Sequence, residues 1–136
     1  MGAQNQERHW DSMVLDLGSP DADDAIIAGA YAYLPRKFQI ESVVLVNGAT
    51  LAASDTNYAQ VSLKNGSDVI AELDTRAAHE NGLTADVAQE MNIDDDYSEV
   101  DSGSTLTVAY DETDAGTNVA LTSAKLIIHG WWKQSA

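Results

Sequence analysis

Apolar side chains recur at every second position in several stretches of this chain, and this alternation limits its fold more than any other feature. A period of two places successive side chains on opposite faces of an extended strand. Strands with one apolar and one polar face are typical of antiparallel sheets that cover a core. The alternating stretches are Phe38–Val46, Tyr58–Lys64, Val69–Leu73 and Leu106–Tyr110.

The same alternation predicts which face of each strand is buried. In the first stretch, Phe38, Ile40, Val44 and Val46 share one face, with Ser42 among them. We expect this face to turn toward the core. The core-facing positions predicted in the other stretches are Ala59, Val61, Leu63, Val69, Ala71, Leu73, Leu106, Val108 and Tyr110.

Turn residues separate the alternating stretches. Asn-Gly pairs, which tolerate the positive φ of tight turns, occur at Asn47-Gly48, Asn65-Gly66 and Asn81-Gly82. The second pair lies directly between two alternating stretches and predicts a β-hairpin. Further turns are predicted at Asp101–Ser104 and Asp114–Thr117. Short strands with frequent turns predict an all-β fold, an antiparallel β-sandwich that is jelly-roll-like.

Three segments are harder to assign. In the last predicted strand, Val119–Trp132, the apolar positions change parity, which a bulge or bend near Thr122-Ser123 would explain. Ser19–Asp21 has the residues of a helix start, but Ile26–Leu34 alternates, so we favour a strand there. Leu83–Met91 fits the spacing of a helix and of a strand equally well, and both remain open.

A chain of 136 residues is long enough for one domain. We expect residues 1–24 to form an N-terminal arm and residues 25–136 to form the β-sandwich. The arm contains an apolar cluster that it cannot bury by itself, comprising Trp10, Met13, Val14, Leu15 and Leu17. Because burying a large apolar side chain is worth roughly 1.5–3 kcal/mol, we expect the arm to pack on its own sandwich or on a neighbouring subunit.

The charge of the chain is strongly unbalanced, with 22 acidic residues against 7 Lys and Arg and a formal net charge of −15. Because such a surface repels phosphate backbones, we expect no nucleic-acid partner. Acidic residues gather at positions 21–24, 94–96 and 111–114, which we predict to be loops at the solvent-facing rim of the sandwich. The basic pair Arg36 and Lys37 is then a candidate for ion pairs with a partner.

Residues that would carry chemistry are sparse. The chain has no cysteine, which excludes a disulfide framework and a thiolate zinc site. His9, His79 and His129 lack the spacing of metal ligands, and the acidic clusters do not match a calcium-binding loop. The sequence has neither a G-x-S-x-G elbow nor a glycine-rich phosphate loop. We therefore predict no catalytic residue, no metal, no cofactor and no enzymatic activity.

Trp131-Trp132 is the most unusual local feature. Neighbouring side chains in a strand point to opposite faces, so one Trp should face the core and the other should not. Tryptophan is enriched at protein interfaces and in sugar-binding sites. The outward-facing Trp is therefore interpreted as an interface residue first, as a residue covered by the N-terminal arm second, and as a sugar platform third.

The ends of the sequence carry no recognised targeting signal. Residues 1–9 are polar and resemble no secretory signal peptide. The longest apolar stretch, about Ala25–Leu34, is far shorter than the ~20 residues of a membrane span. We expect the protein to be made in the cytoplasm and to have no membrane partner.

Six segments between Phe38 and His129 carry a resemblance to a known family. They are Val43–Tyr58, Val61–Gly66, Val69–Thr75, Leu83–Ala85, Gly103–Val108 and Ala120–Ile128. In these segments the chain is similar to small phage virion proteins that decorate the capsid exterior, the cement or decoration proteins. The first 37 residues lie outside this resemblance.

The resemblance implies a β-sandwich that binds the outer surface of an icosahedral capsid and stabilises it, without enzymatic activity. The implied partners are the major capsid protein and further copies of the chain, with a trimer favoured over a dimer. The implied location is the exterior of the virion, after synthesis in the host cytoplasm. We expect the partner contacts to come from Trp10, Met13, Leu15, Leu17, Arg36, Lys37, Trp131 and Trp132.

A competing interpretation is a glycan- or receptor-binding module of a phage head fibre or tail. In that case Trp131, Trp132, Tyr31 and Tyr33 would act as stacking platforms.

Overall fold

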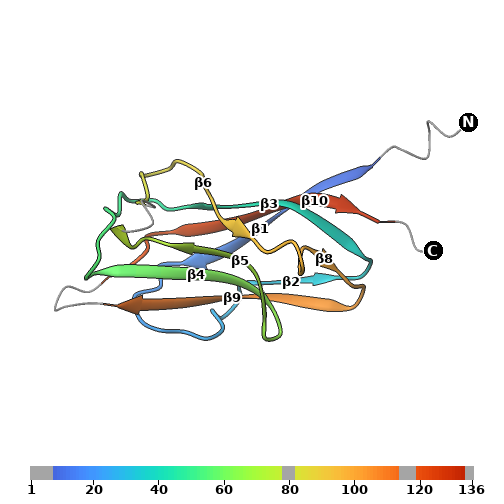
Figure 1. The fold of residues 1–136 in the computed structure, drawn as a ribbon, viewed down its shortest axis with the longest axis horizontal. Coiled ribbons are helices and arrows are strands. Elements are labelled where there is room, and N and C mark those ends of the chain that lie inside the picture. Colours follow the sequence, from blue (N-terminus) through green and yellow to red (C-terminus); the bar gives the residue numbers. More distant parts are fainter. Residues whose placement is uncertain (1–7, 78–81, 114–118, 134–136) are drawn as a thin grey trace, which may run out of the picture.

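The computed structural model describes residues 8–77, 82–113 and 119–133, which form two antiparallel sheets packed on one another (Figure 1). Sheet A has the strand order β1-β10-β3-β6, with β8 also paired to β3, and sheet B has the order β2-β9-β4-β5-β7. The strands are β1 (His9–Gly18), β2 (Tyr31–Leu34), β3 (Phe38–Val46), β4 (Tyr58–Asn65), β5 (Asp68–Asp74), β6 (Gln89–Glu90), β7 (Asn92–Ile93), β8 (Glu99–Val100), β9 (Ser104–Thr113) and β10 (Ala124–Trp132). The predicted antiparallel β-sandwich is confirmed.

The order of the strands shows how the chain is wound. Strands near the two ends of the sequence pair with each other, and so do strands progressively nearer its middle: β1 with β10, β2 with β9, β3 with β6 and β8, and β4 with β5. This is the pairing of one long hairpin whose successive pairs fall in alternate sheets, which is the winding of a jelly roll. Such a fold supports many functions, so function has to be argued from the surface.

The core lies between the two sheets and contains the apolar positions predicted for β4 and β9. The β4–β5 hairpin is also as predicted, with a two-residue loop in which Gly66 has a φ of 62°. Positive φ at the first loop position alone is the pattern of a type II′ turn. The predicted bend at Thr122-Ser123 is present, with Ser123 at a φ of 43°, and β10 begins only after it.

The predicted buried face of β3 is correct for its first half and wrong for its second. Phe38 and Ile40 are buried as expected, but Val43 and Leu45 are buried in place of Val44 and Val46. The register against β10 shifts within β3, where one extra residue, Glu41, has no partner. A bulge of this kind turns the rest of the strand by one face. A similar register shift in β5 buries Ile70 instead of Val69.

Residues 9–18 of the expected arm are strand β1 and belong to the sandwich. β1 pairs with β10 from His9 to Gly18, and Leu15 and Leu17 are buried in the core. Of the two expected packing partners, the chain's own sandwich is therefore the observed one for this segment. The physical reason is that Met13, Leu15 and Leu17 recur at every second position, so one face of an extended strand can cover the core at the edge of sheet A.

Segment 19–30 contains no helix. Ser19, the predicted helix cap, instead accepts a hydrogen bond from the Ser123 amide at 2.9 Å. The chain then runs along β9, where Asp24 and Tyr110 exchange backbone hydrogen bonds of 2.8 and 2.9 Å. The favoured strand within Ile26–Leu34 is present as β2. No helix in the described part of the chain is long and apolar enough to cross a membrane.

The ambiguous segment Leu83–Met91 contains no helix, and a turn at Asp86, with a φ of 61°, divides it. Leu83 pairs with Leu51 in an isolated bridge, and Gln89–Glu90 form β6 at the edge of sheet A. Leu83 and Met91 are both buried.

Candidate functional site

An aromatic cluster lies on the outer face of sheet A, at the end where β1 begins and β10 ends. In the β1–β10 ladder, Trp10 is opposite Trp131 and Ser12 is opposite His129. Directly opposed residues of an antiparallel pair share a face of the sheet. The buried leucines of β1 have the other parity and face the core, so these four side chains face outward.

The rings of this cluster are in direct contact. Trp10 stacks on His129 with ring centroids 5.1 Å apart and an interplanar angle of 11°, and it meets Trp131 edge-on at 5.0 Å. The guanidinium of Arg8 lies 4.1 Å from the centre of the Trp131 ring, a cation–π contact. A 2.8 Å hydrogen bond joins Ser12 Oγ to His129 Nδ1. We call Arg8, Trp10, His129 and Trp131 the aromatic patch.

Trp132 points the other way, as the sequence predicted for two neighbouring tryptophans. Its ring packs edge-on against the buried Phe38 at 4.8 Å, and its indole N–H donates to Asp11 Oδ2 at 3.0 Å. The outward Trp131 is partly covered by Trp10 and Arg8, so contact with the N-terminal segment is observed. Trp10 itself remains 48% exposed, which leaves an accessible aromatic surface.

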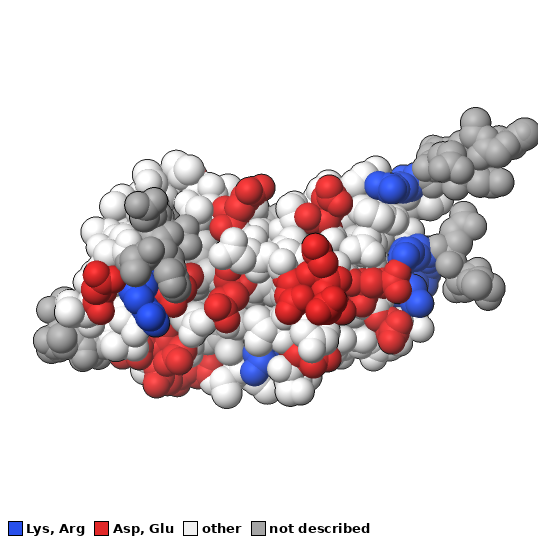
Figure 2. All heavy atoms as spheres, in the orientation of Figure 1, with Lys and Arg blue, Asp and Glu red and all other residues white. Residues whose placement is uncertain are grey.

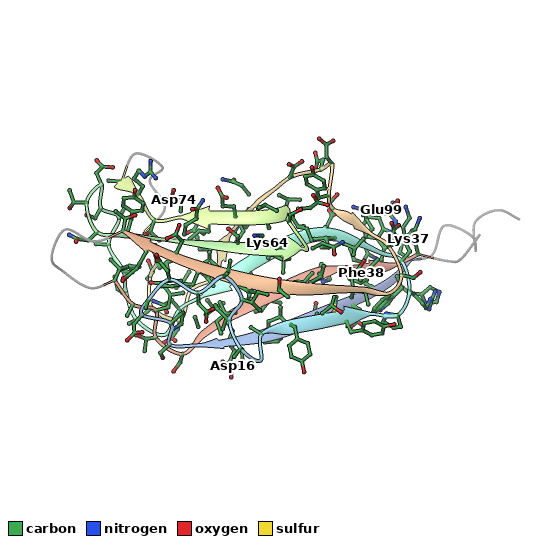
Figure 3. The ribbon with its side chains drawn as sticks, turned by 90° about the horizontal axis from the view of Figure 1, so that it is seen from below. Asp16, Lys37, Phe38, Lys64, Asp74 and Glu99 are labelled. Atoms are coloured by element: carbon green, nitrogen blue, oxygen red, sulfur yellow. The ribbon has the colours of Figure 1, made fainter. Side chains whose placement is uncertain are left out.

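A group of ion pairs lies at the same end of the molecule (Figure 3). Lys37 Nζ is 3.8 Å from Glu99 and 3.7 Å from Asp101, and Lys133 Nζ also binds Glu99. The hydrogen bond from Lys133, with the charges of both lysines, holds the pKa of Glu99 below its usual value. Arg36 donates to the Lys133 carbonyl at 3.3 Å.

Positive charge is therefore concentrated at one end of an acidic molecule (Figure 2). Four of the 7 Lys and Arg residues lie there, namely Arg8, Arg36, Lys37 and Lys133. Acidic side chains form several separate groups on the face shown in Figure 2, and a large group lies directly beside these basic residues. A surface that combines arginine with exposed tryptophan has the composition of an interaction site.

Two of the predicted acidic clusters meet on sheet B. Asp23 Oδ1 accepts a hydrogen bond from the Glu112 amide at 2.8 Å. Burial, followed by the hydrogen bond and charge of Asp23, raises the pKa of Asp111. Asp111 and Glu112 lie within β9, so the prediction that this cluster is a loop is wrong for these two residues. Asp114 lies outside the described residues.

Metal ligands in this chain would have to come from histidine and carboxylate side chains, because it has no cysteine. Within ranges 8–77, 82–113 and 119–133, no group of three or more His, Asp or Glu side chains is placed to hold a metal ion. His9 is exposed at the start of β1, His129 belongs to the aromatic patch, and His79 lies outside the described residues.

The residues expected to contact a partner fall into three groups. Trp10 and Trp131 lie together on the outer face. Trp132 and the half-buried Met13 pack against the core, and Leu15 and Leu17 are part of it. These two leucines were expected to reach a neighbouring subunit or the shell, but their side chains are buried in their own sandwich. Arg36 and Lys37 are exposed but already bind groups of their own chain.

Sequence reasoning missed Arg8 and gave His129 no binding role. Residues two apart in a strand lie on the same face, so Arg8 could have been placed beside Trp10, and His129 beside Trp131, from the sequence. The pairing of β1 with β10, which brings the two sets together, could not be read from either segment alone. Compared with known proteins, the chain matches no family model and no curated protein.

Proposed function

We propose that this protein is a structural virion protein that binds the outer surface of a phage capsid and stabilises it. The observation that carries the proposal is the aromatic patch, an exposed Trp and Arg surface on an otherwise acidic sandwich. The resemblance of residues 38–129 to capsid decoration proteins supports the same function. The proposed partner is the major capsid protein.

The chemistry of the patch suits a protein partner. Tryptophan and arginine are the residues that most often dominate the binding free energy of an interface. Trp10 and Trp131 are held in place by His129 and Arg8, so little side-chain freedom is lost when a partner covers them.

Stabilisation then follows from mass action. A protein that binds only the assembled shell raises the free energy of disassembly by about 2.7 kcal/mol per site when its free concentration is a hundred times Kd. Because a shell carries many equivalent sites, modest affinity at each one adds to a large resistance against disassembly.

Co-sedimentation with empty capsids tests this proposal. We expect the wild-type protein to pellet with the capsids and the Trp10→Ala variant to bind at least about tenfold more weakly, as hot-spot truncations do. Tyr97→Ala, at another exposed aromatic residue, is the matched control and should bind like the wild type. Equal binding by all three proteins, or no binding by the wild type, would contradict the proposal.

A second candidate is a glycan-binding module, favoured by Tyr31 and Tyr33 on β2. Both rings are outward-facing and 61% and 60% exposed, and β2 is the edge strand of sheet B. Two tyrosines spaced two residues apart on one strand face could stack against successive sugar rings. Binding of host polysaccharide that is lost in Tyr31→Ala, with no capsid binding, would favour this function.

A further inference from the structure

Strand β1 is the one long sheet edge in the described structure. Sheet A ends in β1, which has ten residues, and on its other side in β6 and β8, which have two each. Sheet B ends in β2 with four residues and β7 with two. Natural sandwiches keep their edges short or protect them with Pro, Lys, bulges or inward-pointing charges. β1 contains no Pro or Lys, and its protection is limited to Asp11, on the same face as Leu15, and to the register shift between Asp16 and Gly18 at its end.

The outer edge of β1 has backbone groups available for pairing. Its register against β10 is unbroken from His9 to Asp16. Within the described part of the chain, residues 9–17 make no backbone–backbone hydrogen bond other than those of the β1–β10 ladder. The Ser12 amide donates to its neighbour's carboxylate, Asp11 Oδ1, at 2.8 Å, and pairing at this residue would exchange that local contact for one between strands. A regular strand with one edge paired presents unpaired N–H and C=O groups along the other.

We propose that β1 pairs with β1 of a second copy of this chain, antiparallel, about a two-fold axis at Ser12. Sheet A would then continue from one copy into the other. The partner is a second copy because β1 is complementary to itself in charge and in apolar side chains. This self-pairing does not depend on the proposed capsid function.

The side chains select Ser12 as the centre. A two-fold pairing there places Trp10 opposite Val14 of the second copy, and Val14 is 59% exposed in the single chain. It also places Arg8 opposite Asp16 of the second copy, joining a cation to a carboxylate. Asp16 is already 3.4 Å from Lys125, so Arg8 would complete a three-residue charge network. Opposed apolar and opposite-charge pairs are the contacts that stabilise antiparallel strands.

Neighbouring centres are less favourable. An axis at Asp11 would place two Asp11 carboxylates opposite one another, and an axis at Met13 would place Trp10 opposite Asp16. An axis at Val14 would leave Arg8 without an acidic residue opposite it and would place Asp16 opposite Ser12. Like charges directly opposed, or a charge against an indole, weaken a cross-strand pair.

The pairing would bring the two aromatic patches together around the axis on one face of a continuous sheet. It predicts a dimer, in place of the trimer favoured from the resemblance. The closed two-fold symmetry uses up the long edge of both copies and leaves only the short edges exposed.

A cysteine at the axis provides the most direct test, because the native chain has none. Opposed residues of an antiparallel pair have Cα atoms about 4.5–5.5 Å apart, within the range of about 4.4–6.8 Å that a disulfide spans. We expect Ser12→Cys to form a covalent dimer on mild oxidation. Ser67→Cys, at the exposed turn between β4 and β5, is the matched control and should stay largely uncross-linked.

Sedimentation measurements test the same interface without a cross-link. The wild-type protein should sediment as a dimer, and Val14→Lys should raise the dimer Kd about tenfold or more, because a lysine would replace the apolar contact with Trp10 at both symmetric positions. Val87→Lys, at another exposed valine, should leave the Kd unchanged. A monomeric or trimeric wild type, or a Ser12→Cys protein that cross-links no better than its control, would overturn the proposal.

Discussion

At the scale of single residues, Gly130 shows how little room the centre of sheet A leaves. A Cβ at this position would lie 2.0 Å from the Gln39 carbonyl oxygen and 2.9 Å from the Phe38 ring. The close approach occurs where the register of β3 shifts at the Glu41 bulge. Glycine is required because the bulged strand brings its backbone against β10.

We therefore expect Gly130→Ala to be strongly destabilising, by about 3 kcal/mol or more, because backbone has to move to admit one methyl group. Gly103→Ala is the comparison. Gly103 has a φ of 84° but no atom within 4 Å of an added Cβ. Gly103→Ala should therefore lower the free energy of unfolding by only about 1–2 kcal/mol, the cost of placing alanine in the left-handed region. Urea unfolding of both variants measures the difference. A Gly130→Ala protein no less stable than Gly103→Ala would contradict the close approach of β3 to Gly130.

A second residue-scale expectation concerns the carboxyl pair of Asp111 and Asp23. Because the pKa of Asp111 is raised in the folded protein, its neutral form is favoured there. The resulting stability is fully present below the ordinary Asp pKa and is lost as the pH rises through the raised value. Asp111→Asn removes the repulsion between the two carboxylates, so it should raise Tm at pH 7 and have a smaller effect in acid, where the pair is protonated. The expected gain is only roughly 1–2 °C, because solvent screens this exposed pair.

Thermal unfolding between pH 3 and pH 7, with Asp95→Asn as a control for the loss of one charge, checks this expectation. If the gain for Asp111→Asn were the same at both ends of this range, the carboxyl pair would not be its cause.

At the scale of elements, β4 and β9 could be read from the sequence and β1 could not. β4 and β9 follow their alternation throughout, because the register between them has no shift. β3 changes its buried face after a bulge, and β5 departs from the prediction only at Val69, because a bulge inserts one residue without a sequence signal as clear as glycine or proline. β1 was read as an arm because its first half is exposed and its partner, β10, is more than 100 residues away.

The role of β1 in the core can be measured directly. Leu15→Ala should cost about 2–5 kcal/mol in the free energy of unfolding, as buried leucines do, because its side chain is buried between the sheets. Val14→Ala on the outer face should cost less than about 0.5 kcal/mol at concentrations where the protein is monomeric. Denaturant unfolding compares the two variants. If Leu15→Ala were as stable as Val14→Ala, β1 would not be part of the sandwich.

At the scale of the whole molecule, the winding of the chain explains why the candidate site could be predicted only in part. Pairing from the outside inward places the first and last strands side by side, so the aromatic patch is built from both ends of the sequence. Trp131 was identified as unusual and Trp10 as part of an apolar cluster, but their contact depends on a register that alternation does not specify. The charge balance drew attention to the pair Arg36 and Lys37, but the gathering of Arg8 and Lys133 at the same end could not be read from composition.

The central claim is that the aromatic patch contacts the outside of a capsid. An image reconstruction of the virion tests it most directly, because it shows where the protein lies and which face touches the shell. We expect density for the sandwich on the capsid exterior, with the outer face of sheet A and the aromatic patch against the major capsid protein. Density in the tail or inside the shell, or contact through the acidic surface of sheet B, would contradict the claim.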